Sequence, residues 1–159
     1  LTAPTVMICI FLMWIGASPA STGGGIKTTT FAIATLNILA LAKGKTRTEI
    51  YRREVSDNYL RRAFAIIALS LLVNGIAIFL LMITEKDKDL LSLAFETFSA
   101  YSTVGLSLNL TPVLSPAGKI IIIFVMFIGR VSMLSLLIAI TKREKYFNYR
   151  YPKEEIMMN

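Results

Sequence analysis

Leu90-Leu-Ser-Leu-Ala-Phe-Glu-Thr-Phe-Ser-Ala-Tyr-Ser-Thr-Val-Gly-Leu-Ser107 is the stretch of this chain that decides its fold. Its first part, Leu90–Tyr101, is apolar enough for a helix. It is too short to cross a bilayer, because a spanning helix takes about 20 residues. Longer apolar segments flank it at Ala63–Thr84 and Ala117–Thr141. This order of full helix, half-length helix, Thr-Val-Gly turn and full helix predicts a re-entrant loop between two spanning helices.

The composition agrees with a membrane setting. Hydrophobic residues make up 55% of the chain and charged residues only 17%. No charge occurs in Leu1–Ile26 or in Ala63–Thr84, and Arg130 is the one charge between Ile120 and Thr141. A soluble domain with this balance would expose far more apolar surface than water tolerates. The sequence therefore predicts an all-α integral membrane protein.

The basic residues indicate the orientation, because Lys/Arg-rich loops stay in the cytoplasm. They gather in a linker and in a tail, at Lys43, Lys45, Arg47, Arg52, Arg53, Arg61 and Arg62, and at Lys142, Arg143, Lys145, Arg150 and Lys153. We therefore expect both segments in the cytoplasm and the Glu85–Lys119 loop outside. These basic residues flank the apolar segments and account for the net charge of +7, so we do not interpret that charge as a nucleic-acid-binding surface and expect no nucleic-acid partner. Since the chain begins with Leu1 and an apolar run, we expect further spans to precede it.

A run of small residues, Gly16–Gly25, separates the apolar segments Leu1–Ile15 and Ile26–Ala42. Glycine and proline interrupt helices, so the sequence predicts a broken helix at membrane depth. Irregular backbone is tolerated there only where it is buried in protein or lines a watery cavity. The break therefore indicates a transport pathway. We divide the chain into the broken helix (1–42), a cytoplasmic linker (43–62), the helix–loop–helix unit (63–141) and a cytoplasmic tail (142–159).

The turn Ser102-Thr103-Val104-Gly105 suits a dehydrated cation. Backbone carbonyls can replace the hydration shell of K⁺ when an extended turn directs them at an axis. Gly105 lacks a Cβ and reaches backbone conformations that turn a carbonyl inward. The half helix also ends at this turn, and its C-terminal partial negative charge favours a cation. The alternative is an external loop that carries an amphipathic surface helix.

Two cations lie in or beside apolar segments. Arg130 in the last helix costs about 2.5–3.5 kcal/mol on insertion scales, so it must find acceptors within the protein. The carbonyls of the Gly16–Gly25 loop are natural partners, in a contact that is either purely structural or also gating. Lys27 follows the loop. Its ammonium either sits in the cytoplasmic pore mouth, where it competes with K⁺, or extends toward the interface.

Two other function classes deserve weighing. A membrane enzyme that binds a nucleotide at the glycine loop would need Gly, four residues, then Gly-Lys-Ser/Thr. Here Ile26 separates Gly25 from Lys27, so we do not expect an enzyme. A membrane scaffold that transports nothing would leave Arg130 and the broken helix unexplained.

Three motifs together resemble the Trk/Ktr/HKT superfamily of potassium transporters, and the Ktr/Trk membrane subunits in particular. They are Gly16-Ala-Ser-Pro-Ala-Ser-Thr-Gly-Gly-Gly-Ile-Lys27, Phe95-Glu-Thr-Phe-Ser-Ala-Tyr-Ser-Thr-Val-Gly-Leu-Ser107, and Gly129-Arg130. The resemblance implies four helix–pore-loop–helix repeats in one chain around a central pore. This chain would hold the second helix of the third repeat and all of the fourth.

The resemblance also implies function and partners. It implies K⁺ uptake, Na⁺-dependent in some members, with no organic cofactor and no metal beyond the transported ion. Gly105 matches the filter glycine of the fourth repeat. An intramembrane gating loop matches Gly16, Ala17, Ser18, Ser21, Thr22, Gly23, Gly24, Gly25 and Lys27, with Arg130 as its contact on the last helix. Members are homodimers in the bacterial plasma membrane, on a cytoplasmic ring of nucleotide-binding (RCK/KTN-type) regulatory subunits. Many end in a glycine at the dimer interface, where this chain has Asn159.

Overall fold

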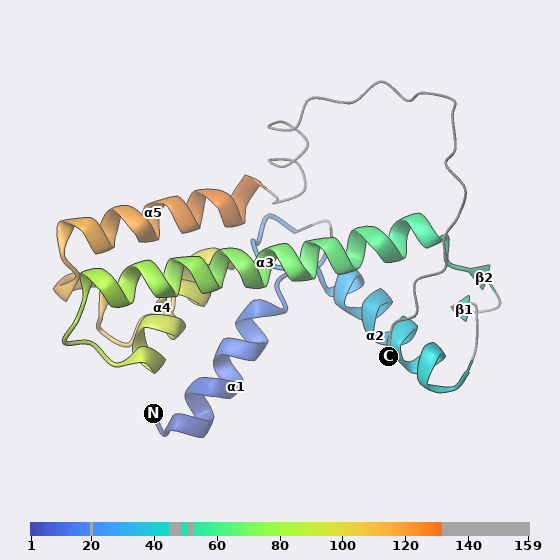
Figure 1. Ribbon diagram of the computed structural model, residues 1–159, viewed down its shortest axis with the longest axis horizontal. Coiled ribbons are helices and arrows are strands. Elements are labelled where there is room, and N and C mark those ends of the chain that lie inside the picture. The colour runs from blue at the N-terminus through green and yellow to red at the C-terminus, as the bar shows by residue number, and fades with distance from the viewer. Residues whose placement is uncertain (20, 45–48, 51–52, 132–159) are drawn as a thin grey trace.

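The computed structural model describes residues 1–19, 21–44, 49–50 and 53–131. Five α-helices carry this part of the chain (Figure 1). In order, the elements are α1 (Ala3–Trp14), α2 (Thr28–Ala42), β1 (Glu49–Ile50), β2 (Arg53–Glu54), α3 (Asp57–Thr84), α4 (Leu90–Tyr101), the 3₁₀ turn η1 (Thr111–Val113) and α5 (Pro116–Val131). The predominantly helical fold is confirmed, with one addition. A short antiparallel hairpin pairs Glu49 with Glu54 and Ile50 with Arg53 inside the predicted linker.

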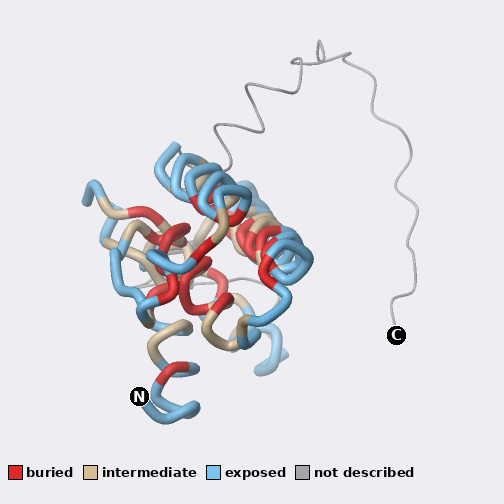
Figure 2. Tube along the Cα trace, turned by 90° about the vertical axis from the view of Figure 1, so that its left-hand side faces the viewer, coloured by how far each residue is buried: buried red, intermediate tan, exposed pale blue. Residues whose placement is uncertain are grey.

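The long helix α3 and the antiparallel α5 run side by side and cover the short helix α4 (Figure 1). Helix α4 also packs against α1. Its buried residues come from every turn, and they include the polar side chains of Glu96, Thr97 and Ser99. The half-length helix is therefore packed on several sides, by α1, α3 and α5. Figure 2 shows buried segments in red, gathered toward the middle of the described chain.

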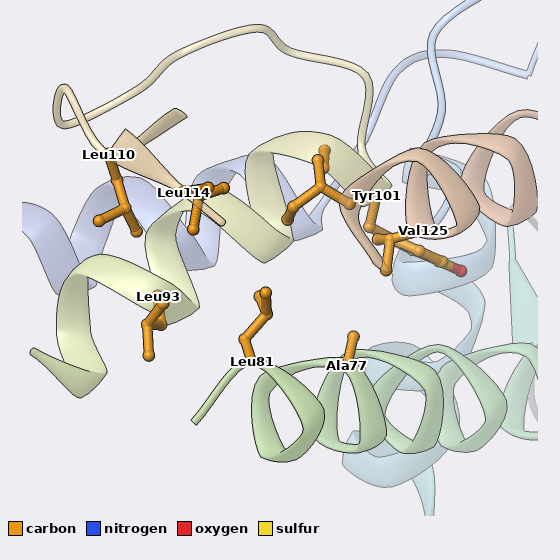
Figure 3. Packing of buried hydrophobic residues seen from close by; sticks show 9 residues of the cluster. Ala77, Leu81, Leu93, Tyr101, Leu110, Leu114 and Val125 are labelled. Carbon is orange, nitrogen blue, oxygen red and sulfur yellow. The ribbon is translucent and has the colours of Figure 1, made fainter. Parts of the chain in front are cut away.

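The core forms where α3, α4 and α5 meet (Figure 3). Its buried side chains are Ala77, Leu81, Leu93, Ala100, Tyr101, Leu110, Leu114, Ile122 and Val125. The outer faces of α3 and α5 are apolar as well, since Phe79 is 64% exposed and Phe124 is 63% exposed. Within the described residues, α3 is the helix that is long and apolar enough to cross a membrane by length and composition. Helices α1 and α2 are apolar but shorter.

The helices of the structure begin and end close to the predicted residues, with one difference at the start of α3. The predicted half helix Leu90–Tyr101 is confirmed at both ends, and the Asp89 side chain caps its first turn by accepting from Leu91 N at 3.2 Å. Helix α3 begins at Asp57, six residues before the predicted Ala63, because a helix can include polar residues that precede its apolar run. The first six residues of α3 therefore fall within the predicted linker, 43–62. Residues 132–141 of the predicted last span and the 142–159 tail, with Asn159, lie outside the described residues.

Glu85 ties the end of α3 to the start of α5. Its side chain is only 8% exposed, and Oε1 accepts a hydrogen bond from Ser115 N at 2.9 Å. A carboxylate at this position also complements the positive end of the α5 dipole. Gly118 lies so close that a Cβ there would be 2.5 Å from the same oxygen. Glu85 therefore fixes the spacing between the two helices that cover α4.

We expect Glu85→Ala to lower the free energy of unfolding by about 1–3 kcal/mol, because the partly buried Ser115 N–H loses its acceptor. The measurement is thermal unfolding of the purified full-length protein in detergent. The control is Asp87→Ala, an exposed acid in the same loop, which should change little. Equal unfolding temperatures for the two variants would mean that the Glu85 contact adds no stability.

Candidate functional site

The glycine-rich loop connects α1 to α2 over residues 15–27 and is closed at its base. Gly16 N donates to Ile26 O at 2.7 Å, and Ile26 N donates to Trp14 O at 3.3 Å. Ile26 is fully buried at this pinch. The two strands of the loop approach so closely that a Cβ at Gly16 would overlap the carbonyl oxygen of Gly24. The chain thus leaves α1, bulges out over residues 17–25 and returns beside its own start.

Lys27 holds this bulge from inside. Its ammonium donates to Gly23 O at 2.6 Å and to Ser21 O at 3.1 Å. The predicted placements of Lys27, in the cytoplasmic pore mouth or extended toward the interface, did not include these two hydrogen bonds. Its place in a pore stays a prediction. The two carbonyls lie four and six residues upstream in the same loop. A lysine engaged by carbonyls is not available to a phosphate, which argues further against nucleotide binding at this loop.

The Thr-Val-Gly turn follows directly from α4. Thr103 N donates to Ala100 O at 3.2 Å and Val104 N to Ser99 O at 3.0 Å, so the helix end is tightened into a turn. Thr103 has φ 55° and Gly105 has φ 84°. Left-handed backbone is unusual for a β-branched residue and marks a strained position of the kind that collects at functional sites. A Cβ at Gly105 would meet nothing within 4 Å, so the backbone angle and not crowding favours glycine there.

The loop and the turn are in direct contact. Gly24 N donates to Thr103 Oγ1 at 2.8 Å, across 79 positions of sequence. A Cβ at Gly24 would lie 2.8 Å from Tyr101 O, and a Cβ at Gly25 would lie 2.9 Å from Ser102 Oγ. The glycines of the loop therefore allow its backbone to lie against the backbone of the turn. Ser102 Oγ is buried at this contact without a hydrogen-bond partner among the described residues.

Helix α5 closes the third side of this junction. Arg130 Nη1 donates to Thr22 O at 2.7 Å, which confirms the predicted contact between this arginine and the loop. The neighbouring Gly129 packs so tightly that a Cβ there would overlap the Tyr101 carbonyl oxygen. A small cleft of about 80 Å³ remains between the three segments. Its lining includes Gly23, Gly24, Gly25, Lys27, Thr30, Ile66, Tyr101, Gly129 and Arg130.

The remaining predicted loop residues shape the bulge and are largely exposed. Ser21 N donates to Ser18 O at 2.9 Å, and Ser21 Oγ accepts from Gly23 N at 3.2 Å. A Cβ at Gly23 would lie 2.6 Å from the Ala17 side chain. The structure thus brings the predicted loop, turn and Arg130 into one junction. Their roles in ion selection and gating stay predictions.

One polar cluster beside the turn escaped the sequence reasoning. Glu96 in α4 accepts hydrogen bonds from the hydroxyls of Ser107 and Thr111. The signal was present, because Glu96 is the one acid within the apolar run Leu90–Tyr101. Among the described residues, no group of three or more His, Cys, Asp or Glu side chains is placed to hold a metal ion.

Comparison with known proteins decides the family. The family described as TrkH, cation transport protein, matches residues 1–149. The chain belongs to this family. It is 43% identical to Ktr system potassium uptake protein B of Bacillus subtilis over 152 residues, which are 96% of this chain and 34% of the relative. The chain thus spans about a third of the length of the curated relatives that it matches.

Two further relatives are similar over nearly the same span. Ktr system potassium uptake protein D of Bacillus subtilis is 42% identical over 99% of this chain and 35% of its own length. Potassium/sodium uptake protein NtpJ of Enterococcus hirae is 41% identical over 96% of this chain and 35% of its own length. The sequence-based assignment to the Trk/Ktr superfamily is therefore confirmed.

Proposed function

We propose that this chain forms part of a K⁺ uptake pathway through a membrane. The observation that carries the proposal is the junction of the Thr-Val-Gly turn with the glycine-rich loop. A buried half helix ends at Tyr101 and directs its partial negative end at the turn. The turn itself exposes Val104 and Gly105. Membership of a cation transport family and the names of the K⁺ uptake relatives support the same conclusion.

In this proposal, Ser102, Thr103, Val104 and Gly105 supply one strand of a selectivity filter. Their backbone carbonyls replace water around a dehydrated K⁺ ion. The strained left-handed angle at Thr103 is retained because the Gly24 N–H binds its hydroxyl and two backbone bonds hold its flanks. Selection thus depends on a turn whose shape is fixed by the neighbouring loop.

The glycine-rich loop is the gate of the proposed pathway. It interrupts the helical path between α1 and α2, so the two helices act as one broken membrane span. Two hydrogen bonds tie its outer part to the rest of the fold, from Arg130 to Thr22 O and from Gly24 N to Thr103, while Lys27 bonds within the loop. A segment held by a handful of hydrogen bonds can move without unpacking the core.

The setting of the proposed pathway is a bacterial plasma membrane that the protein crosses several times. The carried ion is K⁺, and the similarity to a potassium/sodium uptake protein extends the proposal to Na⁺ as a second ion. The proposal includes a homodimer and a cytoplasmic ring of nucleotide-binding regulatory subunits. The relatives named as parts of a Ktr system agree with an assembly of more than one component.

Gly105→Ser in the full-length protein is the test of this function. Bacteria without their own K⁺ uptake systems should grow at limiting K⁺ with the wild type. With the variant they should need about tenfold more K⁺. A residue with a side chain pays about 1–2 kcal/mol to adopt φ 84°, so the turn would lose the backbone conformation that the filter requires. The readout is growth rate against K⁺ concentration.

The matched control is Gly75→Ser, at a glycine of α3 around which a Cβ would meet nothing within 4 Å. Growth of Gly75→Ser cells should follow the wild type. If Gly105→Ser cells also grow like the wild type, the filter lies elsewhere. If the expressed wild type fails to rescue growth even with its regulatory partner, K⁺ uptake is the wrong function.

A further inference from the structure

Glu96 is an acid buried in the middle of the half helix, and neither the filter nor the gate described above uses it. Its side chain is 5% exposed. It lies on α4 nine positions before Gly105, among buried neighbours on the same helix. Within the described part of the chain no lysine or arginine forms an ion pair with it, so its partners are hydroxyl groups alone.

Both carboxylate oxygens of Glu96 bind the segment that follows the turn. Oε2 accepts from Ser107 Oγ at 2.9 Å, and Oε1 accepts from Thr111 Oγ1. The two hydroxyl oxygens are themselves 3.1 Å apart, so the three side chains form a closed triangle. Hydrogen bonds to an ionised carboxylate are about twice as strong as those between neutral groups.

This triangle anchors the downstream side of the Thr-Val-Gly turn. Upstream, the bond from Val104 N to Ser99 O holds the chain to the end of α4. Downstream, the first held residue is Ser107. Only Gly105 and Leu106 lie between these two anchors. The direction of the Gly105 carbonyl is therefore set by where Glu96 holds Ser107.

The return of the chain supports the same conclusion. Asn109 adopts φ 62°, which turns the backbone between the two hydroxyl residues so that both face Glu96. Leu110 then enters the core and η1 begins at Thr111. A two-point attachment to one rigid helix fixes both the position and the tilt of this segment, which a single bond would not do.

We propose that Glu96 is a positioning residue for ion selection, acting through Ser107 and Thr111 on the backbone of Gly105. This inference rests on the proposed function of the turn as a filter strand. A carboxylate is suited to the task because both of its oxygens accept. Glutamine has the same shape but offers one acceptor and one donor group, so it matches two hydroxyl donors less well.

The test compares ion preference and not activity alone. The full-length protein is reconstituted in vesicles, and the K⁺ influx is measured with and without competing Na⁺. Glu96→Gln and the double variant Ser107→Ala/Thr111→Val should each reduce the preference for K⁺ over Na⁺ about tenfold, the equivalent of one charge-assisted hydrogen bond. Ser107→Thr keeps a hydroxyl and should retain the wild-type preference.

Thr97→Val is the matched control on the same helix. It removes a buried hydroxyl whose hydrogen bond, to Leu93 O at 2.7 Å, stays within α4. Its K⁺ preference should equal that of the wild type. A loss of preference as large as in Glu96→Gln would overturn the inference, because any disturbance of α4 would then have the same effect.

The remaining outcomes separate this inference from the proposed function. If the wild type carries K⁺ and the Glu96 and hydroxyl variants keep its ion preference, the inference is wrong and the function stands. If Glu96→Gln fails to accumulate in the membrane, Ser107→Ala alone decides, since that residue is exposed and its removal leaves the core intact. An unchanged preference in Ser107→Ala then overturns the inference. A wild type without K⁺ influx overturns both.

Discussion

Gly129→Ala should abolish transport by the full-length protein and destabilise it by about 3 kcal/mol or more, the upper end of what overpacking costs. A Cβ at this position would overlap the Tyr101 carbonyl oxygen and lie 2.7 Å from its carbon. Both atoms are backbone at the end of α4, so no side chain can rotate away. The clash can be relieved only if α5 moves off the half helix.

A shift of α5 would also affect function, because α5 carries Arg130 next to Gly129. Arg130 is the next residue, and its bond to Thr22 O requires α5 to lie close to the loop. Tyr101 immediately precedes Ser102, the first residue of the proposed filter strand. A displaced α5 therefore disturbs the proposed gate and the proposed filter strand together. Thermal unfolding in detergent and K⁺ influx into vesicles measure the two effects.

Gly75→Ala is the control for this prediction. Gly75 lies within α3, and a Cβ there would meet nothing within 4 Å. Alanine favours a helix over glycine by up to about 1 kcal/mol, so this variant should be as stable as the wild type or slightly more stable. If Gly129→Ala were equally well tolerated, α5 would not approach α4 as closely as the structure describes.

Local sequence signals predicted the parts of the fold that depend on short-range chemistry. The predicted bounds of the half helix are confirmed at both ends, because Asp89 caps its start and a run of small polar residues follows Tyr101. The contact of Arg130 with the loop was also predictable, since a guanidinium within an apolar helix needs acceptors and a glycine-rich loop has spare carbonyls. In both cases an unpaired hydrogen-bonding group would cost free energy, and few local conformations provide it with a partner.

The parts that the sequence did not predict depend on side chains meeting across the fold. The bond between Gly24 and Thr103 joins residues 79 positions apart, and neither sequence motif indicates that the two residues are in contact. The sequence left two placements open for Lys27, and neither included its hydrogen bond to Gly23 O, which depends on the path of the loop. Helix α3 begins six residues before the uncharged stretch Ala63–Thr84, because the absence of charge marks the apolar part of a helix and not its first residue.

Arg130→Ala should raise the K⁺ influx about tenfold, if the glycine-rich loop is the gate. The variant loses a hydrogen bond of 2.7 Å between a guanidinium and the Thr22 carbonyl. Such bonds to charged groups contribute about 1.5–3 kcal/mol, and 1.4 kcal/mol corresponds to a tenfold shift between two states. Removal of the bond therefore favours the displaced, open loop. The measurement is the initial rate of Rb⁺ or K⁺ influx into vesicles.

Two companion variants separate the bond from the charge. Arg130→Lys keeps the positive charge but has a shorter reach and no planar fork, so its influx should lie between the wild type and Arg130→Ala. Arg62→Ala removes an exposed arginine from the first turns of α3 and should leave the influx unchanged. A wild-type rate in Arg130→Ala would make the contact purely structural. A lower rate would mean that Arg130 holds the conducting arrangement, and the loop would then not be closed by this bond.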